Sequence, residues 1–199
     1  MPRAERERQM LDVAVQVFAE HGYAATSMDE IAERVGVSKP MLYEYFSSKE
    51  GLLLAAIREA RAELRRATEQ AVVGATSGED ALRRGLRAYF QFIGQRRAQW
   101  HLLRHELTLM GGSAADEVEA IRQQQTELNA SLLRVFLTAA SDLEVEAAAE
   151  ILVGACERMA IWCERHSEVT PEMATEYTLD ILWGGLQGKQ RPMNETAHR

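Results

Sequence analysis

Apolar positions recur at helical spacing along nearly the whole chain, whereas runs with the alternating pattern of a strand are hard to find. Together with frequent capping signals, this pattern predicts an all-α fold of about nine helices. The signals are densest between Thr26 and Lys49, in the segment TSMDEIAERVGVSKPMLYEYFSSK. They predict two short helices joined by a glycine-bearing turn, an arrangement suited to reading DNA.

The first short helix is predicted to span about eight residues after Ser27. Ser27 and Glu30 fit a capping box, in which each side chain bonds to a backbone N–H that the helix start leaves free. Gly36 would end the helix, because glycine easily reaches a left-handed backbone conformation. The apolar stripe of this helix comprises Ile31, Ala32 and Val35.

The second short helix is predicted to begin after Ser38, its N-cap, and to end near Phe46. Pro40 falls in the first turn, where a missing N–H costs little. Leu42 and Phe46 would anchor the inner face. The positions left largely outside are Lys39, Pro40, Met41, Tyr43, Glu44 and Tyr45. Exposed tyrosines and a methionine are costly on a purely structural helix, but they suit a helix that lies in a major groove.

Roughly the first 57 residues resemble the TetR family of bacterial transcriptional regulators. A helix-turn-helix pattern alone would be weak support, because αα corners with glycine turns are common in unrelated helical proteins. The agreement here extends across three flanking helices, which makes it specific. The matching positions are a helix from about Glu5 to Glu20 with Phe18 buried, then Gly22, Thr26, Ile31, Ala32, Gly36, Val37, Ser38, Leu42, Tyr43, Tyr45, Phe46, Lys49, Glu50, Leu52 and Leu53.

The resemblance implies a set of DNA contacts. Residues of the second short helix would meet base edges: Lys39 could donate to guanine, while Pro40 and Met41 could press on thymine methyl groups. Tyr45 and Lys49 match positions that hold phosphates. The full predicted set is Thr26, Ser27, Ser38, Lys39, Pro40, Met41, Tyr43, Tyr45 and Lys49.

Several residues near this set admit two interpretations. Thr26 or Ser27 would contact phosphate, but Thr26 could also be only a helix cap. Glu44 would either accept from cytosine N4 or simply be solvated. The arginines at positions 3, 6 and 8 form either a basic arm that reaches the DNA or a frayed, solvated terminus.

The net negative charge of the chain limits how a DNA-binding domain of this kind could bind DNA. The whole chain carries a formal charge of −7, and its first fifty residues hold six Lys or Arg against nine Asp or Glu. Bulk electrostatics therefore cannot drive binding. The few cations must be well placed, with acidic groups facing away from phosphate, and few phosphates would be neutralised.

The rest of the chain predicts a larger helical domain. We expect a DNA-binding domain at residues 1–50, a linking helix at 48–71, a ligand-binding and dimerisation domain at 51–187 and a disordered tail at 188–199. Ser77 would cap a helix that runs to about Gly94. Ser141 and Glu144 form another capping box, for a helix that ends near His166. The last helix would open at Pro171.

The last two helices are apolar on more than one side, which predicts a partner helix. We expect a homodimer, with four helices packed about a two-fold axis. The resemblance implies the same, and a two-fold dimer would read an inverted repeat. The predicted interface residues are Gly154, Ile161, Tyr177, Ile181 and Trp183.

Aromatic and methionine side chains in the larger domain could line a pocket for an apolar or aromatic small molecule, although an ordinary core would use the same residues. The predicted ligand-binding set is Tyr89, Phe92, Trp100, His101, Arg104, Phe136, Met159 and Trp162. Arg104 could bind a ligand carboxylate. His101 and His105 have metal-ligand spacing, but a lone HxxxH is weak, so neither a metal nor a cofactor is predicted. Cys156 and Cys163 are predicted core residues, with a redox or metal role as the alternative.

The resemblance implies a repressor that binds operator DNA as a homodimer and is released when a ligand shifts a helix at the domain junction. The alternative is a TetR-like protein that organises DNA or adapts a protein partner without any inducer. No GxGxxG, GxxxxGK, GxSxG or HExxH motif is present, so an enzyme is not expected. With no long apolar run and a charged N-terminus, we expect a cytoplasmic protein without a membrane partner.

Overall fold

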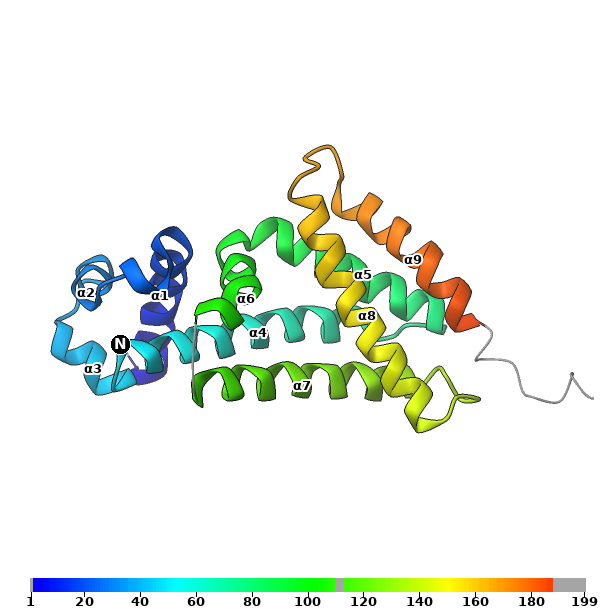
Figure 1. Ribbon diagram of the computed structural model, residues 1–199, viewed down its shortest axis with the longest axis horizontal. Coiled ribbons are helices and arrows are strands. Elements are labelled where there is room, and N and C mark those ends of the chain that lie inside the picture. Colours follow the sequence, from blue (N-terminus) through cyan, green and yellow to red (C-terminus); the bar gives the residue numbers. More distant parts are fainter. Residues whose placement is uncertain (1, 110–112, 188–199) are drawn as a thin grey trace, which may run out of the picture. The chain divides into compact units, whose positions relative to one another are not determined.

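The computed structural model describes residues 2–109 and 113–187, and these form nine α-helices and no strand (Figure 1). The predicted all-α class is therefore confirmed. In chain order the helices are α1 (Arg3–Ala25), α2 (Met28–Val35), α3 (Lys39–Phe46), α4 (Lys49–Val72), α5 (Gly78–Gln95), α6 (Arg97–Leu109), α7 (Ser113–Arg134), α8 (Asp142–Cys163) and α9 (Pro171–Gln187).

Most helix ends agree with the predicted caps, but α1 differs at both ends. It begins at Arg3 and extends to Ala25, beyond the predicted Glu5 and Glu20. A kink at Gly22, with φ 72° and ψ 168°, interrupts the helix without ending it. That conformation suits glycine, which has no Cβ to clash at positive φ.

By packing, the described chain divides into two compact units. The first comprises the residues up to Leu64 together with those from Arg96 to Ile121. Within it α1 packs against α2 and α6, and α2 packs against α3. Its core holds large, fully buried apolar side chains, among them Met10, Phe18, Ile31, Leu42, Leu52, Leu53 and Ile57. Because Leu42 comes from α3, burial in this core fixes that short helix in place.

The second unit comprises residues from Arg65 to Gln95 and those from Arg122 onward. Within it α5, α8 and α9 pack against one another. Ion pairs join its helices: Arg83 of α5 reaches Glu176 of α9, and Arg122 of α7 lies 3.0 Å from Glu157 of α8. The predicted capping box at the start of α8 is present, with the side chain of Glu144 accepting from the Ser141 backbone N–H.

The predicted division at residue 50 stays a prediction, because α4 contributes residues to both packing units. The predicted tail at 188–199 lies outside the described residues. No helix in the described part of the chain is both long enough and apolar enough to cross a bilayer.

Candidate nucleic-acid interface

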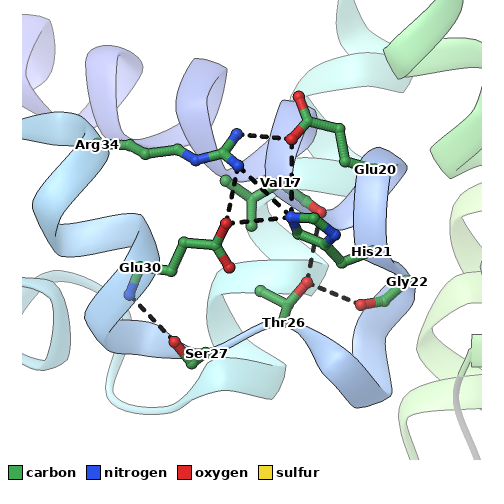
Figure 2. A network of polar contacts seen from close by, with 8 residues as sticks. All are labelled: Val17, Glu20, His21, Gly22, Thr26, Ser27, Glu30 and Arg34. Carbon is green, nitrogen blue, oxygen red and sulfur yellow. Dashed lines mark hydrogen bonds and ion pairs between the residues drawn. The ribbon is translucent and has the colours of Figure 1, made fainter.

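The start of α2 keeps only one half of the predicted capping box. The Ser27 hydroxyl accepts from the Glu30 backbone N–H at 3.1 Å, as expected. The Glu30 carboxylate turns elsewhere, accepting from Arg34 at 2.8 Å and lying 3.1 Å from the His21 ring nitrogen (Figure 2). The reciprocal half of the box was therefore wrong, because a charged partner on the same helix competes for that carboxylate.

A network of charged side chains ties α2 to the end of α1. Arg34 also donates to Glu20 at 2.7 Å, and the His21 ring lies between the two carboxylates (Figure 2). Exposed ion pairs contribute little stability singly. Together they hold α2 in a defined position on α1. The two carboxylates also balance the positive charge of Arg34.

The turn between α2 and α3 forms as predicted. Gly36 is left-handed, with φ 79° and ψ 38°, and its N–H donates to the Ala32 carbonyl at 2.9 Å. The Val37 N–H donates to the same carbonyl at 3.0 Å. Ser38 then caps α3, accepting from the Met41 N–H at 3.4 Å, with Pro40 in the first turn. This turn fixes the direction in which α3 leaves α2.

The two faces of α3 are distinct. Leu42 and Phe46 are buried, at 0% and 7% exposure, as predicted from their spacing. On the outer face Met41 and Tyr43 are 36% and 42% exposed. Lys39, Pro40 and Glu44 are exposed too, whereas Tyr45 is only half-buried. The predicted base-contacting residues therefore share one outward surface.

Lys39, the first residue of α3, is engaged by a carboxylate. Its Nζ lies 2.8 Å from Oδ2 of Asp29, in the first turn of α2. The hydrogen bond and the charge of Asp29 raise the pKa of Lys39. Acidic groups were expected to face away from phosphate, and this stays a prediction; Asp29 lies beside Lys39, a predicted base-contacting residue.

Two other cations of the predicted DNA-binding domain lie over aromatic rings. The Arg3 guanidinium is 4.5 Å from the ring centre of Tyr45, and Lys49 Nζ is 4.5 Å from that of Tyr23. Lys49 also donates to the Ala24 carbonyl at 3.4 Å. A ring positions a cation without cancelling its charge. Within the described residues neither cation has a carboxylate partner, so no side chain of opposite charge balances it. Sequence reasoning missed these contacts, which join residues far apart along the chain.

Thr26 does not have the predicted role. It is 3% exposed, and its hydroxyl donates to the Gly22 carbonyl at 2.7 Å. A second carbonyl, that of Val17, lies at 3.4 Å (Figure 2). A buried hydroxyl committed to backbone carbonyls cannot reach a phosphate. The cap interpretation was also incomplete, because Thr26 closes the end of α1 while the exposed Ser27 starts α2.

The junction between α3 and α4 is tight. Ser47 has a positive φ of 64°, and the Ser48 N–H donates to the Phe46 carbonyl at 2.7 Å, closing a turn of three residues. Ser48 then caps α4, accepting from the Gly51 N–H at 2.9 Å. A Cβ on Gly51 would lie 2.2 Å from the Phe46 carbonyl oxygen. The absence of a side chain at Gly51 therefore permits α3 and α4 to meet.

The predicted ligand-binding residues fall in both packing units. Trp100, His101 and Arg104 lie on α6 in the first unit, whereas Tyr89, Phe92, Phe136, Met159 and Trp162 lie in the second. Trp100 and Phe92 are buried, and His101 is exposed. Trp162 stacks on His166, with ring centres 4.2 Å apart. The side chain of His105 lies outside the described residues, and no cluster of metal-ligating side chains is found among those described.

The predicted dimer residues include two exposed large apolar side chains of α9, Tyr177 and Ile181, but neither of those on α8. Ile181 is 79% exposed, and Tyr177 and Gly154 are also exposed, whereas Ile161 and Trp183 are half-buried. Sequence reasoning missed Ile151, at 62% exposed, and Leu143 on α8, together with Met173 on α9. Leu143, Ile151 and Gly154 follow helical spacing, as do Met173, Tyr177 and Ile181. Each helix thus carries an apolar stripe.

Comparison with protein families matches both parts of the chain. Residues 10–56 match the model described as bacterial regulatory proteins, tetR family, and residues 79–185 match that of the tetracyclin repressor-like C-terminal domain. The chain belongs to the TetR family. The HTH-type transcriptional activator FasR of Mycolicibacterium smegmatis is 33% identical over 190 residues, covering 94% of this chain and 85% of FasR. This TetR-family chain is accordingly a DNA-binding transcriptional regulator, and the proteins that it resembles are regulators, not enzymes.

Solved structures of TetR-family proteins share the fold. A TetR-like transcriptional regulator from Rhodococcus sp. RHA1 superposes with a TM-score of 0.74 at 34% identity, covering 94% of this chain and 99% of that one. The regulator FadR from Bacillus subtilis, in complex with stearoyl-CoA, has a TM-score of 0.80 at 19% identity, covering 89% and 98%. The likeness to FadR shows the fold alone.

Proposed function

We propose that this TetR-family regulator binds an inverted-repeat operator as a homodimer, and that a long-chain acyl ligand in the C-terminal domain changes its affinity for that operator. The observation that carries the DNA-binding part is the two-faced α3, with Leu42 and Phe46 buried and Met41 and Tyr43 presented outward. A helix whose inner face is anchored in a core, and whose outer face presents exposed side chains, fits a major groove.

Base contacts are assigned to Lys39, Pro40, Met41 and Tyr43, and phosphate contacts to Ser27, Tyr45 and Lys49. Ser38 caps the N-terminus of α3, next to the residues assigned to base contacts. We add Arg3 to the phosphate set, because it lies over Tyr45 with its charge intact. With two copies, these few cations neutralise a small number of phosphates, in keeping with a chain of net charge −7.

The homodimer is supported by the apolar stripes on α8 and α9. Two copies would pack these helices as a four-helix bundle. Two-fold symmetry would place the second α3 about 34 Å from the first, which is one turn of the DNA duplex. The operator would therefore be an inverted repeat.

The acyl ligand is supported by the stearoyl-CoA complex of FadR and by the apolar side chains of the second unit, notably Tyr89, Met159 and Trp162. Coupling requires that ligand and DNA favour different conformations, and a coupling of about 1 to 3 kcal/mol is typical. A ligand that bound both conformations equally would leave operator affinity unchanged.

The direction of regulation depends on where the operator lies relative to the promoter. The resemblance predicted a repressor, which blocks the polymerase from a site overlapping the promoter. FasR, by its name, is an activator. We retain repression as the proposal; transcription in vitro from the operator-bearing promoter, with and without the protein, tests it.

The operator can be selected from random-sequence duplexes and its affinity measured by fluorescence anisotropy. Tyr43→Ala should weaken binding to the selected operator by about 1 to 3 kcal/mol while leaving binding to a scrambled duplex nearly unchanged. Lys49→Ala should weaken binding to both duplexes and reduce the salt slope by about 0.9 for each phosphate that is no longer neutralised. Unchanged operator affinity in both variants would contradict the recognition-helix assignment.

A titration of the operator complex with stearoyl-CoA tests the ligand. Release at micromolar concentration supports the proposal, with coenzyme A alone as the matched control for its charged part. If neither stearoyl-CoA nor stearate changes operator affinity, the acyl ligand is wrong, and the ligand-independent organiser gains support.

A further inference from the structure

The ion pair between Asp29 and Lys39 differs from every other contact of the proposed DNA-binding cations. Lys39 Nζ lies 2.8 Å from Asp29 Oδ2, across the turn that joins α2 to α3. The two side chains are 45% and 70% exposed, so the pair faces solvent. By contrast, Arg3 and Lys49 lie over rings that leave their charge intact.

Because of this difference, the cations of the DNA-binding domain are suited to different contacts with DNA. Arg3 and Lys49 can meet any phosphate, which gives affinity without sequence information. Lys39 must first leave a carboxylate. At a phosphate it would exchange one monoanionic oxygen partner for another, with little net gain.

A guanine edge offers Lys39 something different. Its O6 and N7 atoms present two neutral acceptors at fixed positions in the major groove. Lys39 can approach them while its charge is still balanced by Asp29, because an ammonium has three donors and one carboxylate occupies only one of them. A phosphate approaching the same spot would instead meet the exposed Asp29 carboxylate and be repelled.

We propose that Asp29 is a specificity-determining residue of the DNA reader, which withholds Lys39 from phosphates and leaves it available to a base edge. This inference rests on the proposed function, because it takes α3 as the recognition helix. It assigns Asp29 a role at non-specific DNA, where the proposed base contacts are not made.

The test compares Asp29→Asn with the unaltered protein on two duplexes: the inverted repeat selected from random sequence, and a scrambled duplex of equal length and composition. With the carboxylate removed, Lys39 becomes free to meet phosphate. Affinity for the scrambled duplex should rise about two- to five-fold per recognition helix, within the range of an exposed ion pair. Its salt slope should steepen by about 0.9 per recognition helix. Affinity for the selected repeat should change less, so discrimination falls.

Two control variants separate this role from a general charge effect. Glu33→Gln removes the same charge from an exposed position on α2, and should leave discrimination unchanged. In a Lys39→Gln background Asp29→Asn should tighten binding to the scrambled duplex much less, because the cation that Asp29 withholds is gone and only its direct repulsion of phosphate is removed. Urea unfolding of each variant checks that the folded fraction is the same.

Each outcome decides between the two proposals. If Asp29→Asn acts equally with and without Lys39, or tightens both duplexes by the same factor, Asp29 is only a general repeller of DNA and the inference is overturned while the proposed function stands. If Lys39→Gln and Tyr43→Ala both leave affinity for the selected repeat unchanged, the recognition-helix proposal itself fails.

Discussion

At the scale of single residues, two side chains of the same type can make different contacts because their neighbours in space differ. Lys39 and Lys49 both lie at helix starts in the reader, yet one is balanced by Asp29 and the other lies over Tyr23. Position along the sequence cannot distinguish them, because both partners come from other helices. Their neighbours in space decide which contacts each can make with DNA.

Thr26 illustrates how burial redirects a polar residue. Its hydroxyl donates to the Gly22 carbonyl at the kinked end of α1. Thr26→Val keeps the shape but removes the donor, and should lower the free energy of unfolding by about 1 kcal/mol. Thr26→Ser, which keeps the hydroxyl, should retain most of that hydrogen-bond contribution. Urea denaturation measures both. A loss of operator affinity in Thr26→Val without loss of stability would restore the phosphate-contact interpretation.

Cys156 gives the fold a dependence on alkaline pH. Burial raises the pKa of its thiol from 9.0 to about 12. Between these values the unfolded chain loses the proton and the folded chain keeps it, so stability falls as pH rises from about 9 to about 12. In that range the free energy of unfolding falls by up to about 1.4 kcal/mol per pH unit. Below pH 9 the stabilising contribution of the protonated thiol is fully present.

The measurement is the free energy of unfolding of the protein and of Cys156→Ala at pH 8, 9, 10 and 11. Other groups titrate in this range in both proteins, so the difference between the two curves isolates the thiol. The unaltered protein should lose stability faster than Cys156→Ala as pH rises. Parallel curves would show that the thiol is not protected by the fold.

At the scale of helices, the junction between α3 and α4 controls how the recognition helix is presented. The Phe46 carbonyl oxygen occupies the place that a side chain on Gly51 would need. Gly51→Ala should displace the end of α3, costing about 1 to 3 kcal/mol of stability. Operator affinity should fall with it, because the outward face of α3 would no longer lie in register with the groove.

Gly85→Ala in the middle of α5 is the matched control. A Cβ there would meet a Val72 methyl group at 3.5 Å, which is ordinary contact. This change should stabilise the protein by about 0.5 to 1 kcal/mol, because alanine is the better helix former. Thermal unfolding and operator binding measure both variants. Equal behaviour of the two would refute the steric role of Gly51.

Helix positions were largely predictable from the sequence because caps act locally. Ser38, Gly36 and Ser141 set helix ends through hydrogen bonds to residues at most four positions away. The end of α1 was not predictable in this way, because a glycine at positive φ, such as Gly22, can either end a helix or only kink it. Glu30 was misjudged for a related reason: two partners competed for one carboxylate, and only the spatial arrangement decides between them.

The candidate site was predictable to the level of a surface, but not to the level of its electrostatics. Periodicity placed Leu42 inside and Tyr43 outside. The pairing of Asp29 with Lys39, or of Arg3 with Tyr45, depends on how separate helices cross, and periodicity within one helix carries no information about that. The predicted ligand-binding set stays a prediction, because its residues come from several helices and periodicity within one helix does not say whether they meet.

At the scale of the whole molecule, the stripes on α8 and α9 predict a dimer that one charge can break. Ile181→Glu should leave the fold intact, because Ile181 is 79% exposed in the single chain, and should convert the dimer to monomer. A charge buried at an interface without a partner is strongly destabilising. Sedimentation velocity at micromolar concentration measures the change.

Val135→Glu is the control for that experiment, because Val135 is 67% exposed but lies outside both stripes. It should leave the sedimentation coefficient unchanged. If Ile181→Glu remains dimeric as well, the dimer is formed through another surface. Operator binding by a monomeric Ile181→Glu variant as tight as that of the unaltered protein would show that the two half-sites are read independently.

The apolar stripes also have a consequence for dosage. If the two half-sites are filled only by a dimer, then below the dimer dissociation constant the concentration of the binding species varies as the square of the chain concentration. Halving the amount of chain in a cell would cut that species about four-fold by the same mass action. Synthesis rate and dilution by growth would then regulate the target gene in their own right, even at a constant level of ligand.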